Sequence, residues 1–167
     1  MSNPPKTVTA SDKQLNESRK IAEQIVQGAT LATLRGVPKK SLDALYALAY
    51  NDYNAGQYQK AEKIFRFLCL YDHMEKRYWK GLAATLQNQG KYAQAVGVYA
   101  HEALLDMDDP EPPFQASFCF LADKNYGEAK KALEAVVAIV NENPQHKSYL
   151  AKAQELLRSL DKRQEQS

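Results

Sequence analysis

The sequence lacks the features that mark a membrane, secreted or nucleic-acid-binding protein. No apolar run approaches the roughly 18 residues of a membrane span, and the opening MSNPPKTVTASDK has no apolar core of a secretory signal. The net charge at pH 7 is only +2, and no dense Lys/Arg cluster marks a phosphate-binding patch. We therefore expect a cytoplasmic protein with no stable membrane insertion and no direct contact with nucleic acid.

Residues with catalytic or metal-binding chemistry are also scarce. Cys69 and Cys119 form no C-x-x-C motif and sit among apolar residues, which predicts two buried thiols in a reducing cytoplasm. His73, His101 and His146 are scattered and have no cysteine or carboxylate at ligand spacing. No glycine-rich phosphate loop is present. We therefore expect no catalytic residue, metal site or cofactor, and we do not expect an enzyme.

Tyrosine is abundant instead, with ten residues. Tyr46, Tyr50 and Tyr53 stand at i, i+4 and i+7, so a helix would place them in one stripe. A second apolar face of the same helix comprises Leu45, Leu48 and Ala49. If that second face packs against neighbouring helices, the tyrosine stripe is left for a partner.

The sequence repeats itself with a period of 34 residues. The segments GQYQKA, GKYAQA and KNYGEA align, with Tyr58, Tyr92 and Tyr126 in register. A repeat of about 34 residues that contains two helices is typical of tetratricopeptide repeats. The second copy also carries WKGLA at 79–83, which matches the opening of that pattern with Ala83 in place of a glycine. The period predicts an all-α solenoid of three tandem tetratricopeptide repeats.

The repeats predict how the rest of the chain is organised. The expected parts are a disordered arm over 1–10, an N-terminal helical segment over 11–37, repeats at about 41–72, 75–107 and 111–140 within 38–140, a capping helix over 144–161 and a polar tail over 162–167. A stack of repeats exposes an apolar end, and we expect the last helix to cover it.

The period also places the tyrosine stripe within a groove. Two periods further on, the stripe positions hold Phe114, Phe118 and Leu121, whereas the middle repeat holds small or polar residues there. Because first helices line the concave wall of such a stack, we expect a groove with an aromatic patch at each end and a polar middle. The expected groove residues are Tyr46, Tyr50, Tyr53, Asn54, Lys80, Ala84, Gln87, Asn88, Phe114, Phe118 and Leu121.

Such a groove suits an extended peptide with a few large or proline side chains, because a preformed extended chain loses little entropy on docking. One alternative is that the first helix or the chain's own termini cover the aromatic residues. Another is a generic tetratricopeptide scaffold that joins folded cytoplasmic proteins. A scaffold groove usually binds a charged tail and is lined with Lys and Arg, whereas only Lys80 and Arg77 lie near the middle of this one.

The run from 49 to 100 resembles the class II chaperones of bacterial type III secretion systems, which guard pore-forming translocators. Its specific marks are FRFLCLYD at 65–72 and GLAA at 81–84. Upstream, GATLATLRGVP at 28–38 resembles the segment that precedes the first repeat in that family. The likeness extends over about residues 15–160. One departure is charge, because these chaperones are often acidic and this chain is slightly basic.

The resemblance implies a bacterial cytoplasmic chaperone that binds hydrophobic translocators before secretion. It implies that the groove, at Tyr46, Tyr50 and Tyr53, holds a short P-x-L-x-x-P-like motif from the N-terminal region of the client. It also implies a homodimer formed through the N-terminal helix, and an AraC-type transcriptional regulator as a further partner of some members. The candidate dimer contacts are Leu15, Ile21 and Ile25.

Overall fold

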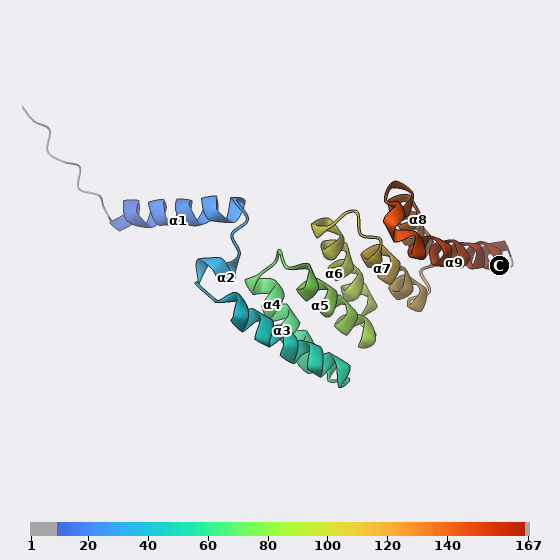
Figure 1. Ribbon diagram of the computed structural model, residues 1–167, viewed down its shortest axis with the longest axis horizontal. Helices are drawn as coiled ribbons and strands as arrows, with labels where there is room; N and C mark the ends of the chain where they lie inside the picture. The colour runs from blue at the N-terminus through green and yellow to red at the C-terminus, as the bar shows by residue number, and fades with distance from the viewer. Residues whose placement is uncertain (1–9, 166–167) are drawn as a thin grey trace, which may run out of the picture.

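The computed structural model describes residues 10–165, and within that range the chain is helical with no strands (Figure 1). In chain order the elements are α1 (Ala10–Val26), α2 (Leu31–Leu34), α3 (Lys39–Asn54), α4 (Tyr58–Tyr71), α5 (Lys76–Asn88), α6 (Tyr92–Leu105), α7 (Glu111–Ala122), α8 (Tyr126–Glu142), the 3-10 turn η1 (Pro144–His146) and α9 (Lys147–Glu165). The predicted all-α class is confirmed. The arm expected over 1–10 lies outside the described residues, except for Ala10, which begins α1.

Helices α3 to α9 pack each against the next along the chain. The turns inside the three helix pairs share one geometry, because Gly56 and Gly90 both have φ of 72° and Lys124, at the equivalent third position, has φ of 59°. In each turn the next residue donates its N–H to the carbonyl five residues earlier, at 2.8–3.0 Å. This left-handed cap ends the first helix and turns the chain into the second one.

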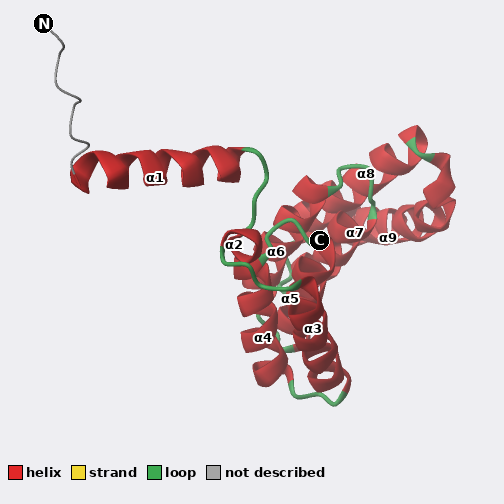
Figure 2. Cartoon of the chain, turned by 60° about the vertical axis from the view of Figure 1, so that its left-hand side comes forward, coloured by secondary structure: helices red, strands yellow, loops and turns green. Residues whose placement is uncertain are grey.

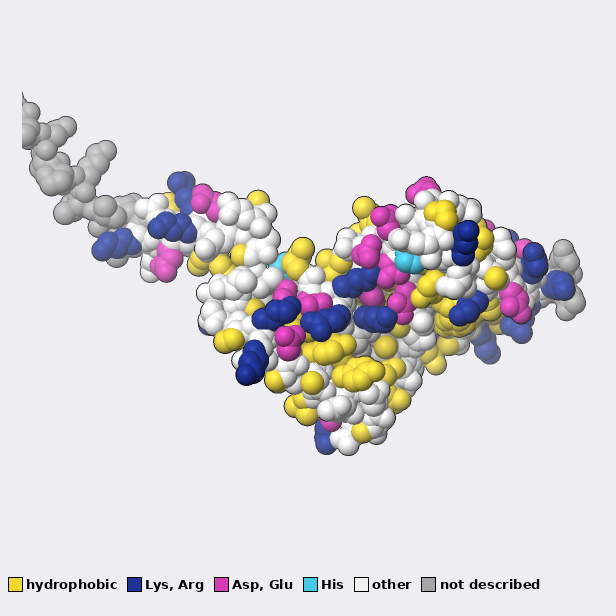
Figure 3. Space-filling model, in the orientation of Figure 1, with side chains coloured by type: hydrophobic (Ala, Val, Ile, Leu, Met, Phe, Trp, Pro, Cys, Tyr) yellow, Lys and Arg dark blue, Asp and Glu magenta, His cyan; other side chains and the backbone are white. Residues whose placement is uncertain are grey.

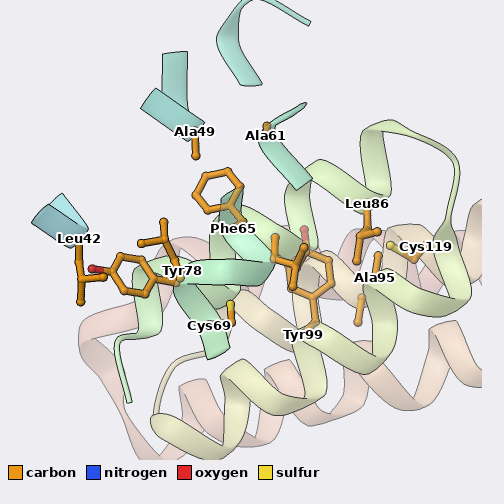
Figure 4. Packing of buried hydrophobic residues seen from close by; sticks show 14 of the residues in the cluster. Leu42, Ala49, Ala61, Phe65, Cys69, Tyr78, Leu86, Ala95, Tyr99 and Cys119 are labelled. Atoms are coloured by element: carbon orange, nitrogen blue, oxygen red, sulfur yellow. The ribbon is translucent and has the colours of Figure 1, made fainter. Parts of the chain in front are cut away.

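The core lies between the paired helices. An alanine that is fully buried and a large buried side chain recur on each second helix: Ala61 and Phe65, Ala95 and Tyr99, Ala129 and Leu133. Figure 4 shows the Phe65 ring of α4 pointing towards Ala49 of α3. Small residues at these crossings let the helices approach closely, and the large side chains of Phe65, Tyr99 and Leu133 fill the space that remains.

The C-terminal helix α9 packs against α8 and buries Ala153 and Leu160 in a second apolar cluster. It runs to Glu165, so the expectation that the helix ends at 161 and is followed by a tail is wrong for 162–165. Two contacts with α8 hold this last stretch in place. Lys130 Nζ pairs with Asp161 at 2.7 Å, and Arg163 Nη1 donates to the Tyr126 hydroxyl at 2.8 Å.

The first helix, α1, projects away from the stack (Figure 2). Every α1 side chain from Lys13 to Val26 is exposed, so α1 does not cover any part of the tyrosine stripe. None of the helices within residues 10–165 combines the length and the apolarity needed to cross a bilayer.

Candidate peptide-binding groove

The three tyrosines of α3 lie at different depths. Tyr46 packs edge-on against Phe65, with ring centroids 6.0 Å apart, and its centroid is 5.9 Å from that of Tyr78. Tyr50 stacks on Tyr46 at 6.2 Å and is 50% exposed. Tyr53 is partly buried against the same core. The stripe is therefore anchored at Tyr46 and Tyr53 and presents Tyr50 to the outside.

The buried face of α3 differs from the expected one. Leu42 and Ala49 are buried and Leu45 is partly buried, but Leu48 is half-exposed. The reason is that α4 and α5 pack on the side of α3 that carries Leu42, Ala49 and Tyr46. The expectation that Leu48 packs against neighbouring helices is therefore wrong.

An apolar cavity of about 180 Å³ lies over these tyrosines, between α3 and α5. Its lining residues are Tyr46, Tyr50, Tyr53, Phe65, Arg77, Lys80, Gly81 and Ala84. The Arg77 guanidinium lies 5.0 Å from the centre of the Tyr46 ring, at the edge of the cavity. On the face shown in Figure 3, hydrophobic side chains gather over α3 and α5 beside a band of charged side chains.

A second, polar cavity of about 210 Å³ adjoins the first, between α5 and α7. Its lining residues are Tyr53, Lys80, Ala84, Gln87, Asn88, Tyr99, Glu102, Glu111 and Gln115, so three of them also line the apolar cavity. Several of these side chains form hydrogen bonds with one another. Asn88 donates to the Tyr53 hydroxyl at 3.0 Å, and the Tyr99 hydroxyl donates to Gln87 Oε1 at 2.7 Å. Together the cavities form one groove, apolar over α3 and polar between α5 and α7.

Seven of the eleven expected groove residues line these two cavities. The other four, Asn54, Phe114, Phe118 and Leu121, line neither. The Phe114 ring is 7% exposed and packs edge-on against Tyr149 of α9 at 5.3 Å. The expectation that Phe114 faces the groove is therefore wrong, because the chain's own C-terminal helix covers it.

The other two residues of the expected second aromatic patch, Phe118 and Leu121, are also partly covered by neighbouring side chains. Phe118 packs edge-on against Phe114 at 5.1 Å and remains 37% exposed, whereas Leu121 is partly buried in the C-terminal cluster. Asn54 is exposed at the last residue of α3. Of the three residues expected to form this patch, Phe118 is the one whose ring stays substantially exposed.

Some groove residues are absent from the expected set. Phe65 forms part of the apolar cavity although it stands on a second helix, and Glu102 lines the polar cavity from α6. A stripe traced along first helices alone misses both. Glu102 does have a sequence signal, because the same repeat position holds Leu68 in the first repeat and Val136 in the third. A carboxyl group at a position that is otherwise apolar and buried is unusual.

Both cysteines are free thiols in buried positions. Burial raises the pKa of Cys69 to about 12 and that of Cys119 to about 11, so both thiols are protonated at neutral pH. Among the described residues, no group of three or more His, Cys, Asp and Glu side chains is arranged to hold a metal ion.

Stacked helix pairs with a groove on their first helices define a tetratricopeptide-repeat protein, and the tetratricopeptide repeat family matches residues 42–74 and 78–102. The chaperone protein SicA of Salmonella typhimurium is 37% identical over 140 residues, which are 84% of this chain and 82% of SicA. The chain belongs to the translocator chaperones of type III secretion systems.

Solved structures of this family have the same fold. The translocator chaperone SycD of Yersinia enterocolitica superposes with a TM-score of 0.71 at 32% identity, over 78% of this chain and 98% of SycD. PcrH of Pseudomonas aeruginosa, in complex with the chaperone-binding region of PopD, has a TM-score of 0.71 at 36% identity, over 77% and 97% of the two chains. SycD is also known with a peptide of the translocator YopD and in an alternative dimer.

Proposed function

We propose that this chain is a cytoplasmic chaperone that binds hydrophobic translocator proteins before their secretion. An extended segment from the N-terminal region of the client lies in the groove and keeps the client from aggregating. The observation that carries the proposal is the pair of adjoining cavities on α3, α5 and α7, one apolar and one polar. Relatives that are chaperones, two of them solved with translocator segments, support it.

The two cavities suit different parts of an extended peptide. The apolar cavity accepts one large aliphatic or proline side chain against the faces of Tyr46 and Tyr50. The polar cavity offers Gln87, Asn88 and their neighbours to the peptide backbone. Burial of a well-fitted anchor contributes on the order of 1–3 kcal/mol, and a few such anchors dominate an interface. Phe118 is proposed as an outer contact at the far end of the groove.

A scaffold that captures the charged tail of a folded protein is less well supported. The two cations beside the groove are already paired, since Lys80 Nζ lies 2.7 Å from Glu111 and Arg77 Nη2 lies 2.9 Å from Glu75 and 3.3 Å from Asp43. A carboxylate tail would have to compete with these partners. An extended client segment with apolar anchors needs no free cation, and its binding involves no catalysis.

We further propose that α1 mediates homodimerisation. Leu15, Ile21 and Ile25 are exposed on a helix that projects away from the stack, so this apolar face is free to pack against another copy. SycD also forms a dimer, which supports homodimerisation as such. An AraC-type regulator stays a predicted second partner.

Co-expression tests the client role. The chain is co-expressed with each hydrophobic translocator encoded in the same secretion gene cluster, and the amount of translocator in the soluble fraction is compared with and without it. We expect at least one translocator to become soluble only in the presence of the chain and to co-purify with it. If every translocator stays aggregated and none co-purifies, the proposed function is wrong.

A further inference from the structure

Glu102 occupies a position that the fold otherwise fills with an apolar side chain. A shift of 34 residues aligns Glu102 with Leu68 in the first repeat and Val136 in the third, and both of these are 0% exposed. Glu102 is equally deep, at 1% exposed. The second repeat therefore carries a carboxyl group at a site where the other two repeats have a hydrophobic contact.

This carboxyl group has no hydrogen-bond partner among the described residues. Both of its oxygens are shielded from solvent, and neither accepts a hydrogen bond. A buried polar group without a partner is destabilising, so each such group in a native protein calls for a specific explanation, and a partner outside the chain is one. Glu102 lies at one wall of the polar cavity, whose volume of about 210 Å³ leaves room for part of a peptide.

The lysines near Glu102 do not form an ion pair with its carboxyl group. On α5, Lys80 pairs with Glu111 at 2.7 Å, and Lys76 pairs with both Asp106 and Asp109. The nearest cations are therefore engaged by other carboxylates. From α7, the negative charge of Glu111 faces Glu102 as well.

The pKa of Glu102 reflects these surroundings. The pKa is raised to about 7, mainly by burial and also by the negative charges of Glu111 and Asp109, while Lys76 and Lys80 act in the opposite direction. About half of the Glu102 carboxyls are therefore ionised at neutral pH. The ionised form is a strong acceptor that the chain itself leaves unused.

We propose that Glu102 is the polar recognition residue of the groove: its carboxyl, buried at the wall of the polar cavity, turns into the cavity when the client binds and accepts a hydrogen bond from an N–H group of the client segment. This proposal rests on the proposed client-binding function and names the contact that fixes the position of the segment. The apolar cavity selects a large side chain, and Glu102 selects the donor that lies next to it. The unpaired carboxyl destabilises the free chain, and the hydrogen bond to the client removes this destabilisation on binding.

A pH dependence of client binding follows from this contact. Binding of an N–H donor favours the ionised carboxyl, so affinity increases as the pH rises through the pKa of the free protein. With a pKa of about 7, the ionised fraction grows about tenfold between pH 6 and pH 8. The apparent dissociation constant falls by up to the same factor of about ten, because the ionised carboxyl is a stronger acceptor than the neutral one.

The test uses overlapping synthetic peptides that tile the translocator which co-purifies with the chain. Affinities are measured by fluorescence polarisation at pH 6, 7 and 8 for the wild type, Glu102→Gln and Glu102→Leu. The control Leu68→Met makes a volume-conserving change at the equivalent position of the first repeat, away from both cavities. Circular dichroism of each variant establishes that the helices are intact.

We expect Glu102→Leu to bind on the order of tenfold more weakly than the wild type at pH 8. Its own affinity should be the same at all three pH values, so its difference from the wild type should shrink towards pH 6. Glu102→Gln keeps an acceptor oxygen and should bind with intermediate affinity, also without pH dependence. Glu102→Leu should melt at a higher temperature than the wild type, since it restores an apolar core residue. Leu68→Met should keep the affinity and pH dependence of the wild type.

Two results overturn the proposal in distinguishable ways. If peptides bind the wild type, and Glu102→Leu and Glu102→Gln keep both its affinity and its pH dependence, Glu102 is not a recognition residue while the client-binding function stands. If no peptide binds the wild type at any of the three pH values, the client-binding function and the role of Glu102 fail together.

Discussion

Helices α4 and α5 cross closely at Gly81, and we therefore predict that Gly81→Ala destabilises the fold whereas Gly97→Ala, in α6, stabilises it. At Gly81, a Cβ would lie 2.3 Å from Phe65 Cε1 and 2.4 Å from its Cζ. Carbon atoms in contact prefer about 3.5–4.0 Å, so the ring would have to move by more than about 1 Å. Phe65 is buried and its ring packs against Tyr46, so a shift of the ring would either break this contact or fill part of the apolar cavity.

The expected magnitude follows from two opposing terms. Replacing glycine with alanine inside a helix stabilises it by about 1 kcal/mol, whereas overpacking a core destabilises it by about 1–3 kcal/mol or more. The contact at Gly81 is severe and involves an aromatic ring, so we expect Gly81→Ala to lower the free energy of unfolding by about 2 kcal/mol. For a chain of this size, that lowers the melting temperature by roughly 4–8 °C.

Gly97→Ala is the matched control, because Gly97 lies inside α6 and a Cβ there would meet nothing within 4 Å. It should raise the free energy of unfolding by about 0.5–1 kcal/mol. Both variants are compared with the wild type by urea unfolding and by thermal melting followed by circular dichroism. A Gly81→Ala variant as stable as the wild type would refute the close crossing, and with it the position of Phe65 in the wall of the apolar cavity.

Three further predictions test other parts of the structure. Lys124→Gly should stabilise the protein by about 1 kcal/mol in urea unfolding, because Lys124 has φ of 59° where the equivalent turns have glycine; no gain would contradict this turn. Burial acts to raise the pKa of Glu62, but hydrogen bonds from Lys91, Gln89 and Arg66 outweigh it and lower the pKa to about 2. Because the folded-state pKa is below that of the unfolded chain, the stabilisation is complete above about pH 5 and is lost as the pH falls towards 2. Glu62→Gln should therefore destabilise by on the order of 2 kcal/mol at pH 7 and progressively less in acid, and a constant difference would exclude this network. Removal of residues 1–27 should convert a dimer to a monomer in sedimentation, and an unchanged mass would rule out α1 as the dimer contact.

The repeated part of the fold follows from local sequence. Ala61, Ala95 and Ala129 recur at one spacing because each second helix must cross its partner closely, and this spacing was enough to predict the three helix pairs. The polar middle of the groove was predicted for the same reason, since Lys80 and Gln87 lie on a first helix in a known register.

The parts that the period did not predict depend on contacts between distant residues. Phe114 matches Tyr46 in register, but only the packing of Tyr149 of α9 decides that Phe114 is covered. The last turns of α9 also make a contact that no local pattern predicts, since Arg163 donates to the hydroxyl of Tyr126, which lies 37 residues away in the chain. Glu102 departs from the repeat pattern in the sequence, but the sequence alone does not show that it lines the polar cavity.

The central claim is that a client segment binds over Tyr50, and the affinity of Tyr50→Ala for that segment tests it most directly. Tyr50 is half-exposed and makes its ring contact with Tyr46, so its removal should leave the melting temperature nearly unchanged. Tyr46 and Tyr53 pack against the core, so the double variant Tyr46→Ala/Tyr53→Ala is expected to lose stability and is not a clean test.

Leu104→Ala, which removes an exposed apolar side chain from α6 outside both cavities, is the matched control. Titration calorimetry with the tiled translocator peptides compares both variants with the wild type. The account predicts that Tyr50→Ala binds on the order of tenfold more weakly, with unchanged helicity, and that Leu104→Ala binds like the wild type. Equal affinity of Tyr50→Ala and the wild type would contradict the account, because the client would then lie elsewhere on the chain.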